Sequence, residues 1–408
     1  MAISPIPHWF EGSEYTHKVA ACIMKYGPIS RITLAQILGL SQGAVSRITS
    51  DLIYAGVIEE TPMAAGHGGK LPKDLLRKSA QQSIQKENTE RRGRPQTGLR
   101  IIANARTFVG MKINTTHITA VTVNALGQIV TGCHDLPLDD DSPESVVDVI
   151  RQLTMDCADE AIMAGLPSPC AVGVSLGGHI TDDSVTTFAP FLHWSKPVEF
   201  SAMIRKATGL PTGIYNDIDS LVVDACMFGS GVGLNSFAVV TIGIGVGYSL
   251  TVNGEPIDNP DKSYGLVGHI LVDPDGPRCI SGHKGCATCL TDNSIATEYS
   301  EMIGHPATFD EFAAAARASK TQATNLVNRT CFRLGTLIAT IANLAMPDKI
   351  MIAGESSFIA KLGIDNLRNG INMYRHSQAA PVDFELAEHD WSLWSKAAAA
   401  QAIRQYVG

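Results

Sequence analysis

The first sixty residues contain three short helix patterns whose ends are marked by capping residues. Residues 16–26 place apolar side chains on one helical face, and Gly27-Pro28 ends this pattern. Ser30 can cap a second helix that ends at Gly39, and Ser41 can cap a third over residues 42–55. A strand-like Val57-Ile58-Glu59-Glu60 follows. This order predicts a helix-turn-helix unit that continues into the hairpin of a winged helix.

A helix-turn-helix unit places the N-terminal half of its third helix in the major groove of DNA. Gln and Arg side chains there can bind base edges, whereas Ser and Thr mostly reach phosphate oxygens. The alternative is a small helical interaction domain that binds no DNA. We predict DNA binding through residues that would be exposed at the start of the third helix: Ser41, Gln42, Gly43, Ser46, Arg47 and Ser50.

A segment rich in glycine and basic residues follows the predicted helix-turn-helix. Residues 63–97 contain few large apolar side chains and read as an enlarged wing or linker, with a short helix around residues 73–85. The segment ends in Arg91-Arg92-Gly93-Arg94-Pro95, before a strand-like stretch at residues 99–102. Extended arginines fit the negative potential of a narrow minor groove, so Arg91, Arg92 and Arg94 are predicted DNA contacts. The alternative is a solvated basic linker.

The charge balance separates this N-terminal region from the remainder of the 408-residue chain. Residues 1–104 carry 13 Lys and Arg against 8 Asp and Glu, whereas the other residues carry 19 against 32. A basic module on an acidic body suits a nucleic-acid reader attached to a second function. The N-terminus has no signal-peptide pattern and no apolar run is long enough to cross a membrane, so we expect a cytoplasmic protein with no membrane partner. Nine cysteines, mostly isolated, fit a reducing compartment.

From residue 105 onward the pattern changes to that of an α/β domain. Apolar strands at residues 108–113 and 117–123 are followed by a turn and a third strand at residues 128–130. A long helix over residues 143–163 leads to a strand at residues 171–175 that runs into Gly177-Gly178. This order of hairpin, helix and strand predicts the ribonuclease-H-like α/β fold shared by sugar kinases and actin-like ATPases.

One histidine and three cysteines are clustered between residues 265 and 289. His269 is followed at +10, +17 and +20 by Cys279, Cys286 and Cys289, with glycines and a proline between them. Neutral imidazole and thiolate suit Zn²⁺, and a glycine-rich loop can fold back to bring such ligands together. The stretch therefore predicts a structural Zn²⁺ site. The alternative is three scattered thiols beside a surface histidine.

Taken together, these motifs make the chain resemble the ROK family of repressors, open reading frames and kinases, and its repressor branch in particular. The motifs are the helix-turn-helix, Gly177-Gly178, Asn216-Asp217, the strand-turn-strand at residues 241–247, Val267-Gly268-His269 and the cysteine loop. The resemblance implies a two-lobed body behind the winged helix. We expect a DNA-binding domain at 1–104, a first lobe at 105–215 plus 380–408, and a second lobe with the zinc loop at 216–379.

The resemblance also implies a carbohydrate site in the cleft between the lobes. Gly177, Gly178, Asn216, Asp217 and His269 match family positions that bind sugar, while Asn216-Asp217 could instead be only a helix-capping pair. Two family glutamates that bind sugar hydroxyls are replaced here by Leu266 and Thr288. Since carboxylates are strong acceptors, these changes leave the identity of the effector open.

Family kinases begin the body with an Asp-x-Gly-Gly-Thr turn that helps to place metal-bound phosphates. The matching residues here are Lys112-Ile113-Asn114-Thr115-Thr116, so the carboxylate and both glycines are missing. Gly243, Gly245 and Gly247 remain, but this spacing is as common in structural hairpins as in phosphate cradles. Ala353-Gly354-Glu355 replaces the adenosine-side glycine pair. Because phosphoryl transfer depends on positioned, neutralised phosphates, we predict that the chain is not an enzyme.

The metal loop departs from the family pattern at its second thiol, which is Ser281 here. A serine hydroxyl stays protonated and is a poor zinc ligand. Cys279 and Cys286 match the first and last family thiols, and Cys289 is our predicted fourth ligand beside His269. His283, Ser281 and water remain alternatives.

We therefore expect a transcription regulator, most simply a repressor of genes for carbohydrate uptake or catabolism. Its partners would be a double-stranded DNA operator, a small carbohydrate or sugar-phosphate effector, and further copies of itself in a homodimer or homotetramer. An ATP-dependent sugar kinase, or a regulator with a vestigial sugar site, are the alternatives.

Overall fold

The computed structural model describes residues 5–63, 71 and 97–408, and divides them into two compact units. The first unit contains the described residues up to Leu234 together with Trp391–Gly408, and the second is Asn235–Asp390. These bounds differ from the expected 215/216 and 379/380. The reason is that helix α7 (Asp217–Phe228) packs along the terminal helix α13 (Trp391–Val407), which keeps both helices in the first unit.

The winged helix at the N-terminal end has the predicted caps. The side chains of Ser30 and Ser41 accept hydrogen bonds from the backbone N–H groups of Thr33 and Ala44, and Gly39 ends the second helix in a left-handed conformation at φ 65°. Each cap satisfies a backbone group that has no partner inside its helix. The elements are α1 (Glu14–Tyr26), α2 (Arg31–Leu38), α3 (Gln42–Tyr54), β1 (Ile58–Pro62) and β2 (Thr97–Ile101).

The wing is the antiparallel pair of β1 and β2, in which Ile58 lies opposite Ile101. The apolar faces of α1, α3 and both strands meet in one core that contains Val19, Leu52 and Leu99. The short helix expected around residues 73–85 lies outside the described residues, as do Arg91, Arg92 and Arg94.

The first unit also contains a five-stranded sheet in the order β5-β4-β3-β6-β9. The first three strands are antiparallel and the last two run parallel to β3, which is the order expected of a ribonuclease-H-like fold. The bounds are β3 (Thr107–Ile113), β4 (His117–Asn124), β5 (Ile129–Pro137), α5 (Pro143–Met163), β6 (Val172–Leu176), β7 (His179–Thr181), β8 (Val185–Phe188), α6 (Phe200–Thr208) and β9 (Thr212–Asn216), with one-turn helices at Ala103–Ala105 and Pro190–Leu192.

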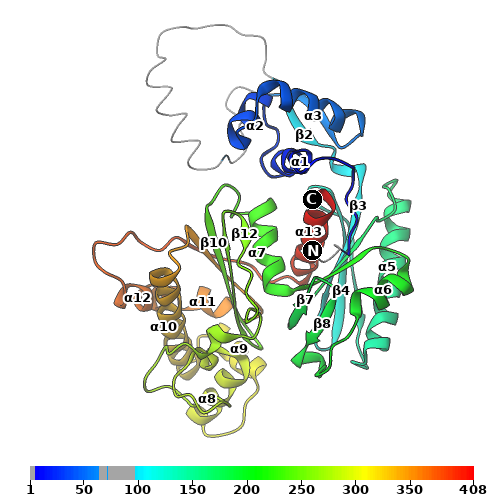
Figure 1. Cartoon of the computed structure of the whole chain (residues 1–408). Helices are drawn as coiled ribbons and strands as arrows, with labels where there is room; N and C mark the ends of the chain where they lie inside the picture. Colours follow the sequence, from blue (N-terminus) through cyan, green and yellow to red (C-terminus); the bar gives the residue numbers. More distant parts are fainter. Residues whose placement is uncertain (1–4, 64–70, 72–96) are drawn as a thin grey trace. The chain divides into compact units, whose positions relative to one another are not determined.

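Strand β3 is buried on both faces, and alternate residues reach different cores. Val109, Met111 and Ile113 pack with α5 in one core. Phe108 and Gly110 face α13, which lies along the other side of the sheet (Figure 1). A Cβ atom on Gly110 would collide with the carbonyl oxygen of Ser395, so this glycine allows the backbone of α13 to approach the strand.

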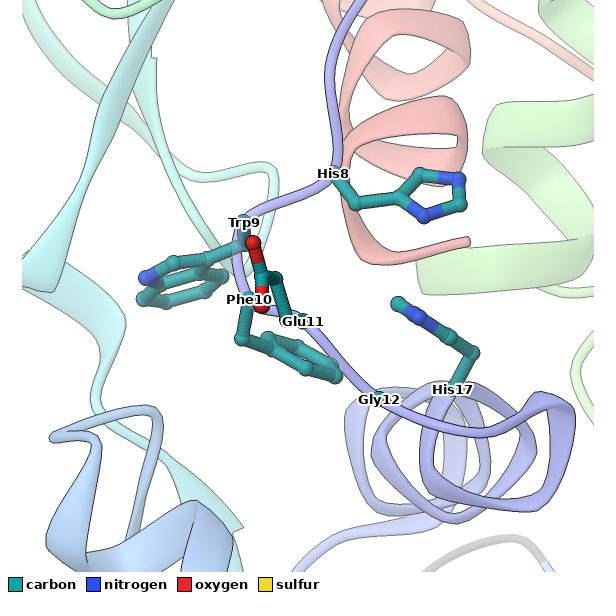
Figure 2. Close-up of a pocket in the computed structure, with 6 residues that line it drawn as sticks. All are labelled: His8, Trp9, Phe10, Glu11, Gly12 and His17. Carbon is teal, nitrogen blue, oxygen red and sulfur yellow. The ribbon is translucent and has the colours of Figure 1, made fainter.

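The chain before α1 is attached to the end of α13. The backbone N–H of Trp9 donates to the carbonyl oxygen of Tyr406 at 2.6 Å, and His17 Nδ1 donates to that of Val407 at 2.7 Å. Phe10 stacks on the His17 ring, with ring centroids 4.8 Å apart. Figure 2 shows the side chains around the resulting hollow of about 450 Å³, which is lined by His8, Trp9, Phe10, Glu11, Gly12 and His17.

The second unit repeats the sheet plan of the first, in the order β12-β11-β10-β13-β14. Its core gathers around the long helix α10, in which Leu334, Leu337 and Ile338 are fully buried. The bounds are β10 (Ser236–Ile242), β11 (Val246–Val252), β12 (Glu255–Pro256), η3 (Leu266–His269), η4 (Ala287–Leu290), α8 (Asp292–Ile303), α9 (Phe309–Arg317), α10 (Thr321–Leu344), β13 (Lys349–Ala353), α11 (Phe358–Leu362), α12 (Ile364–Met373) and β14 (Phe384–Leu386).

The two sheets confirm the predicted α/β fold class, with one ribonuclease-H-like sheet in each unit and a winged helix at the N-terminal end. Among the residues that the structure describes, no helix combines the length and the apolar character needed to cross a membrane.

Gly173 tests the close approach of α13 to the sheet, because a Cβ atom there would collide with the carbonyl oxygen of Ala398. We expect Gly173→Ala to lower the free energy of unfolding by about 1–3 kcal/mol, the usual cost of overpacking. The matched control is Gly43→Ala in α3, where a Cβ atom meets nothing within 4 Å. That change should be neutral or stabilise by up to about 1 kcal/mol. Urea denaturation followed by circular dichroism measures the stability of both variants. Equal unfolding midpoints would contradict the close approach of α13 to Gly173.

Candidate functional site

The predicted DNA-reading residues form one exposed face at the start of α3. Ser41, Gln42, Gly43, Ser46, Arg47 and Ser50 are all exposed, whereas Val45, Thr49 and Leu52 on the opposite face are buried. No described residue bonds to the side chain of Gln42 or Arg47, so both are available to a partner. The Ser50 hydroxyl donates to the carbonyl oxygen of Ser46 at 2.9 Å and keeps its acceptor lone pairs.

The buried side of α3 is tied to its neighbours by Arg31. Its Nε donates to the hydroxyl of Thr49 at 2.9 Å, and its guanidinium pairs with Glu60 of the wing at 2.8 Å. One side chain of α2 therefore links the recognition helix to the wing. Such a link holds the exposed face of α3 in a fixed orientation within the winged helix.

The four predicted carbohydrate-binding residues of the first unit lie together where β6 and β9 end. Asn216 is the last residue of β9 and caps α7, because its side-chain oxygen accepts from the N–H groups of Ile218 and Asp219. Its amide nitrogen donates to the carbonyl oxygen of Gly178 at 3.0 Å. The capping alternative is therefore present, and the same side chain also fixes the glycine turn beside Asp217.

Asp217 forms a buried ion pair with Lys112. The Lys112 ammonium donates to Oδ2 of Asp217, and their side chains are only 6% and 12% exposed. Oδ1 of the carboxylate accepts from the N–H of Ile218 at 3.0 Å, in the first turn of α7. The carboxylate is thus held by an internal cation and by a helix N-terminus, which both stabilise its negative charge.

Two tryptophans at the start of α13 also surround Lys112. Its Nζ lies 5.4 Å from the ring centroid of Trp394 and 6.0 Å from that of Trp391, within cation–π range. Sequence reasoning assigned no role to these residues. The available signal was the pair of tryptophans three residues apart in an otherwise alanine-rich helix, which places both on one helical face.

The glycine-rich turn of the second unit joins β10 to β11. The N–H of Gly243 donates to the carbonyl oxygen of Gly245 at 3.1 Å, as in a structural hairpin. A Cβ atom on Gly243 would collide with the carboxylate of Glu355, so this carboxylate covers the glycine. This carboxylate places a negatively charged side chain beside the glycine-rich turn.

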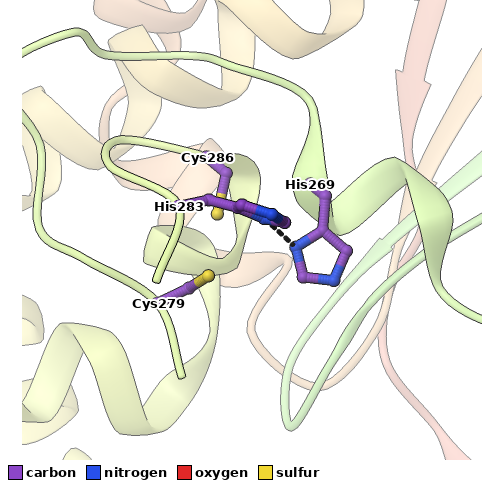
Figure 3. A group of neighbouring side chains, drawn as sticks. All are labelled: His269, Cys279, His283 and Cys286. Carbon is purple, nitrogen blue, oxygen red and sulfur yellow. Dashed lines mark hydrogen bonds between the residues drawn. The ribbon is translucent and has the colours of Figure 1, made fainter. Parts of the chain in front are cut away.

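The metal loop brings together His269, Cys279, His283 and Cys286. One ligand atom from each lies within 4.8 Å of those of the other three. Figure 3 shows the two imidazole rings joined through their Nδ1 atoms, which are 3.1 Å apart, with both thiols beside them. Two imidazoles and two thiols are a donor set that suits tetrahedral Zn²⁺.

The predicted fourth ligand, Cys289, is not in this group, and His283 is there in its place. Cys289 lies on η4, is 3% exposed and packs in the core of the second unit. This burial raises the pKa of the Cys289 thiol to about 12. The short helix that follows Cys286 turns Cys289 inward, which the three-residue spacing alone does not reveal.

Cys279 is the more accessible of the two thiols in the group. Desolvation raises its pKa, but hydrogen bonds from the Cys286 thiol and from the backbone N–H of His283 outweigh this effect, so the pKa lies below its ordinary value. Cys286 also bonds the hydroxyl of Thr288, with Sγ and Oγ1 2.9 Å apart. Thr288, which replaces a family glutamate, therefore interacts with a thiol of the loop, whereas Leu266 is 60% exposed.

The Lys112–Asp217 ion pair predicts a large loss of stability when only one of its two residues is replaced. We expect Lys112→Met to lower the free energy of unfolding by about 3–5 kcal/mol, because it leaves a buried carboxylate without its cation. The double variant Lys112→Met/Asp217→Asn should recover much of that loss.

The matched control is Lys18→Met, which breaks an exposed pair with Glu14 and should leave the free energy of unfolding nearly unchanged. Chemical denaturation of the wild type and of these three variants gives the values. A double variant that is as unstable as Lys112→Met would show that the loss does not come from an unpaired carboxylate on Asp217.

Comparisons with known proteins agree along nearly the whole chain. The chain is 23% identical over 354 residues to the DNA-binding transcriptional repressor Mlc of Escherichia coli strain K12, covering 83% of this chain and 80% of that protein. It is 21% identical over 359 residues to the xylose repressor of Bacillus subtilis strain 168, covering 87% and 86%.

A solved structure of a ROK family transcriptional regulator, a homologue of E. coli Mlc, has the same fold. It superposes with a TM-score of 0.73 at 23% identity and covers 96% of each chain. The sequence model of the ROK family matches residues 108–393, which is most of both units. The chain belongs to the ROK family.

Proposed function

We propose that this protein is a sugar-responsive DNA-binding transcription regulator, acting in the cytoplasm as a repressor of genes for carbohydrate uptake or catabolism. The observation that carries the proposal is the exposed face of α3 in the winged helix, where the side chains of Gln42 and Arg47 are open to solvent. The matches to the Mlc and xylose repressors support it, because each covers more than four fifths of this chain.

DNA recognition by one helix-turn-helix is weak, and two copies related by a two-fold axis double the contacts on an inverted repeat. The protein would therefore act as a homodimer, or as a homotetramer built from dimers. Arg91, Arg92 and Arg94 are proposed to reach the minor groove beside each half-site.

The effector is proposed to be a small carbohydrate or sugar phosphate that contacts Gly177, Gly178, Asn216 and Asp217. An amide and a carboxylate side by side at the end of β9 suit vicinal hydroxyl groups. In this chain the carboxylate already pairs with Lys112, so a ligand would meet an ion pair and not an isolated acid. His269 is carried over from the family as a further sugar contact.

A sugar kinase is disfavoured by two observations. The aspartate that matches the general base of family kinases, Asp217 here, is already engaged in an ion pair with the buried Lys112. In the second unit the Glu355 carboxylate covers Gly243, the first glycine of the possible phosphate turn. Both features oppose the binding and transfer of a phosphoryl group.

The metal group of the second unit is proposed to hold one structural Zn²⁺ through His269, Cys279, His283 and Cys286. The donor set fits the ion, since two thiolates would balance its charge and two neutral imidazoles complete a tetrahedron. When bound, the ion would fix the exposed end of the loop.

DNA binding can be tested on fragments selected by the full-length protein from a random double-stranded library. We expect Arg47→Ala to weaken binding to a selected fragment roughly 10- to 100-fold, since one base-edge contact contributes about 1–3 kcal/mol. Arg205→Ala, an exposed arginine of α6, is the charge-matched control and should bind as the wild type. Mobility shifts at several salt concentrations give the affinities. Failure to select any fragment, or equal losses in both variants, would sink the proposal.

The metal proposal predicts one Zn²⁺ per chain by elemental analysis. His283→Ala should lower the affinity for Zn²⁺ at least about tenfold, because it removes one of four ligands. Cys289→Ser should keep full metal content, although it places a hydroxyl in the core and lowers thermal stability. Zinc lost from Cys289→Ser but retained in His283→Ala would reverse this assignment.

A further inference from the structure

The metal loop has a hydrogen-bonded fold of its own, independent of the four ligand side chains. The N–H groups of Val272 and Asp273 both donate to the carbonyl oxygen of Gly285, at 2.9 and 3.0 Å. The N–H of Gly285 donates to the carbonyl oxygen of Pro277 at 2.8 Å, and that of Cys279 donates to His283 at 2.9 Å. These bonds close the loop on itself and bring its two ends side by side.

Gly285 is required at the point where the loop closes. Its φ is 67°, and a Cβ atom there would collide with the carbonyl oxygen of Asp273. The returning chain at Gly285 thus packs directly against the backbone of Asp273. An interaction that fixes the position of Asp273 therefore also fixes the closed form of the loop.

Asp273 is held by Arg333 of α10, an arginine that is only 3% exposed. Its Nε donates to Oδ2 of Asp273 at 2.8 Å, and Nη1 and Nη2 donate to the carboxylate of Glu298 on α8 at 2.6 and 3.4 Å. Oδ1 of Asp273 accepts from the N–H of Asp275 at 3.0 Å, so both oxygens of this carboxylate are used. Arg329 also pairs with Glu298, at 2.9 Å, but its side chain is 44% exposed and forms no hydrogen bond or ion pair with the described residues of the loop.

The ligand residues lie on the outer side of this anchored loop. His269 and His283 are exposed, Cys279 is half-buried, and Cys286 alone is buried. Ile280, next to Cys279, is fully exposed. Solvent therefore reaches three of the four ligand residues, while Arg333 on the inner side is only 3% exposed.

We infer that Arg333 is a positioning residue that holds the loop in its metal-binding form whether or not a metal is bound. The metal site is then preformed and exchanges its ion with solution, without unfolding of the loop. This differs from structural zinc sites in which the metal supplies the folding energy. The inference rests on the proposed metal binding, and it adds a residue that touches neither the metal nor its ligands.

The first test compares the full-length wild type with Arg333→Met and with Arg329→Met as the matched control. Metal-free wild type should protect the amides of residues 271–286 from hydrogen exchange nearly as well as the zinc-loaded form. In Arg333→Met the protection factors of these amides should fall at least tenfold, whereas in Arg329→Met they should stay unchanged. A metal-free wild type whose loop exchanges as an unfolded segment would overturn the inference.

The second test measures Zn²⁺ affinity by competition with a chromophoric chelator. Arg333→Met should bind roughly 10- to 100-fold more weakly, the usual effect of removing support behind a metal ligand set. EDTA should remove Zn²⁺ from the wild type with an unchanged far-ultraviolet spectrum, and added Zn²⁺ should restore full occupancy. Equal affinities of Arg333→Met and Arg329→Met would overturn the positioning role.

Asp273→Asn serves if Arg333→Met does not fold, because it weakens only the contact with the loop and leaves Arg333 paired with Glu298. It should show the same loss of protection and affinity, and a variant unchanged in both would overturn the inference. If the wild type binds neither Zn²⁺ nor Co²⁺, the proposed metal site fails. The hydrogen-exchange comparison still decides whether Arg333 holds the loop.

Discussion

The close packing of α13 on the sheet of the first unit is the contact on which most of that unit depends. Backbone can approach backbone there only because Gly110 and Gly173 lack side chains and the facing helix is rich in alanine. The approach is short enough that the helix cannot shift without opening voids, since protein cores are densely packed. Its position sets three further contacts: the indole rings beside Lys112, the pair of Lys396 with Asp224, and the hydrogen bonds that the carbonyl oxygens of Tyr406 and Val407 accept from Trp9 and His17.

The Lys112–Asp217 ion pair shows how a binding position can be kept while its chemistry changes. A carboxylate at the N-terminus of α7 is stabilised by the helix dipole, but as a buried charge it still needs a cation or several hydrogen bonds. In this chain the cation is Lys112 of β3, which is separated from β9 by β6. The carboxylate is therefore held in an internal ion pair. The proposed carbohydrate site would then present this ion pair beside the amide of Asn216.

The parts of the structure that the sequence predicts well are those set by local rules. The ends of α2 and α3 follow from Ser30, Gly39 and Ser41, because a cap depends only on residues within one turn. Strands β3, β4 and β6 follow from the apolar runs at residues 108–113, 117–123 and 171–175. The ion pair of Lys112 with Asp217 could not be read in this way, because its partners are 105 residues apart and neither residue type specifies the other.

The metal loop illustrates the same limit at short range. Spacing alone favours Cys289, which lies three residues after Cys286, over His283. In the structure η4 carries Cys289 into the core of the second unit, away from the ligand group, and the turn at Gly282 brings His283 to His269. Burial alone does not separate the candidates, because Cys286 is as buried as Cys289 and still belongs to the group.

Both candidate ligand sites are shaped by an ion pair that lies beside the ligand-contacting atoms. Lys112 fixes the carboxylate of Asp217, and Arg333 fixes the backbone of the metal loop through Asp273. Each cation is more than nine tenths buried, so its side chain has already lost its freedom before any ligand arrives. A ligand then need not order the site, which lowers the entropy cost of binding. The cost falls on folding instead, where a buried pair is stabilising only while both partners are present.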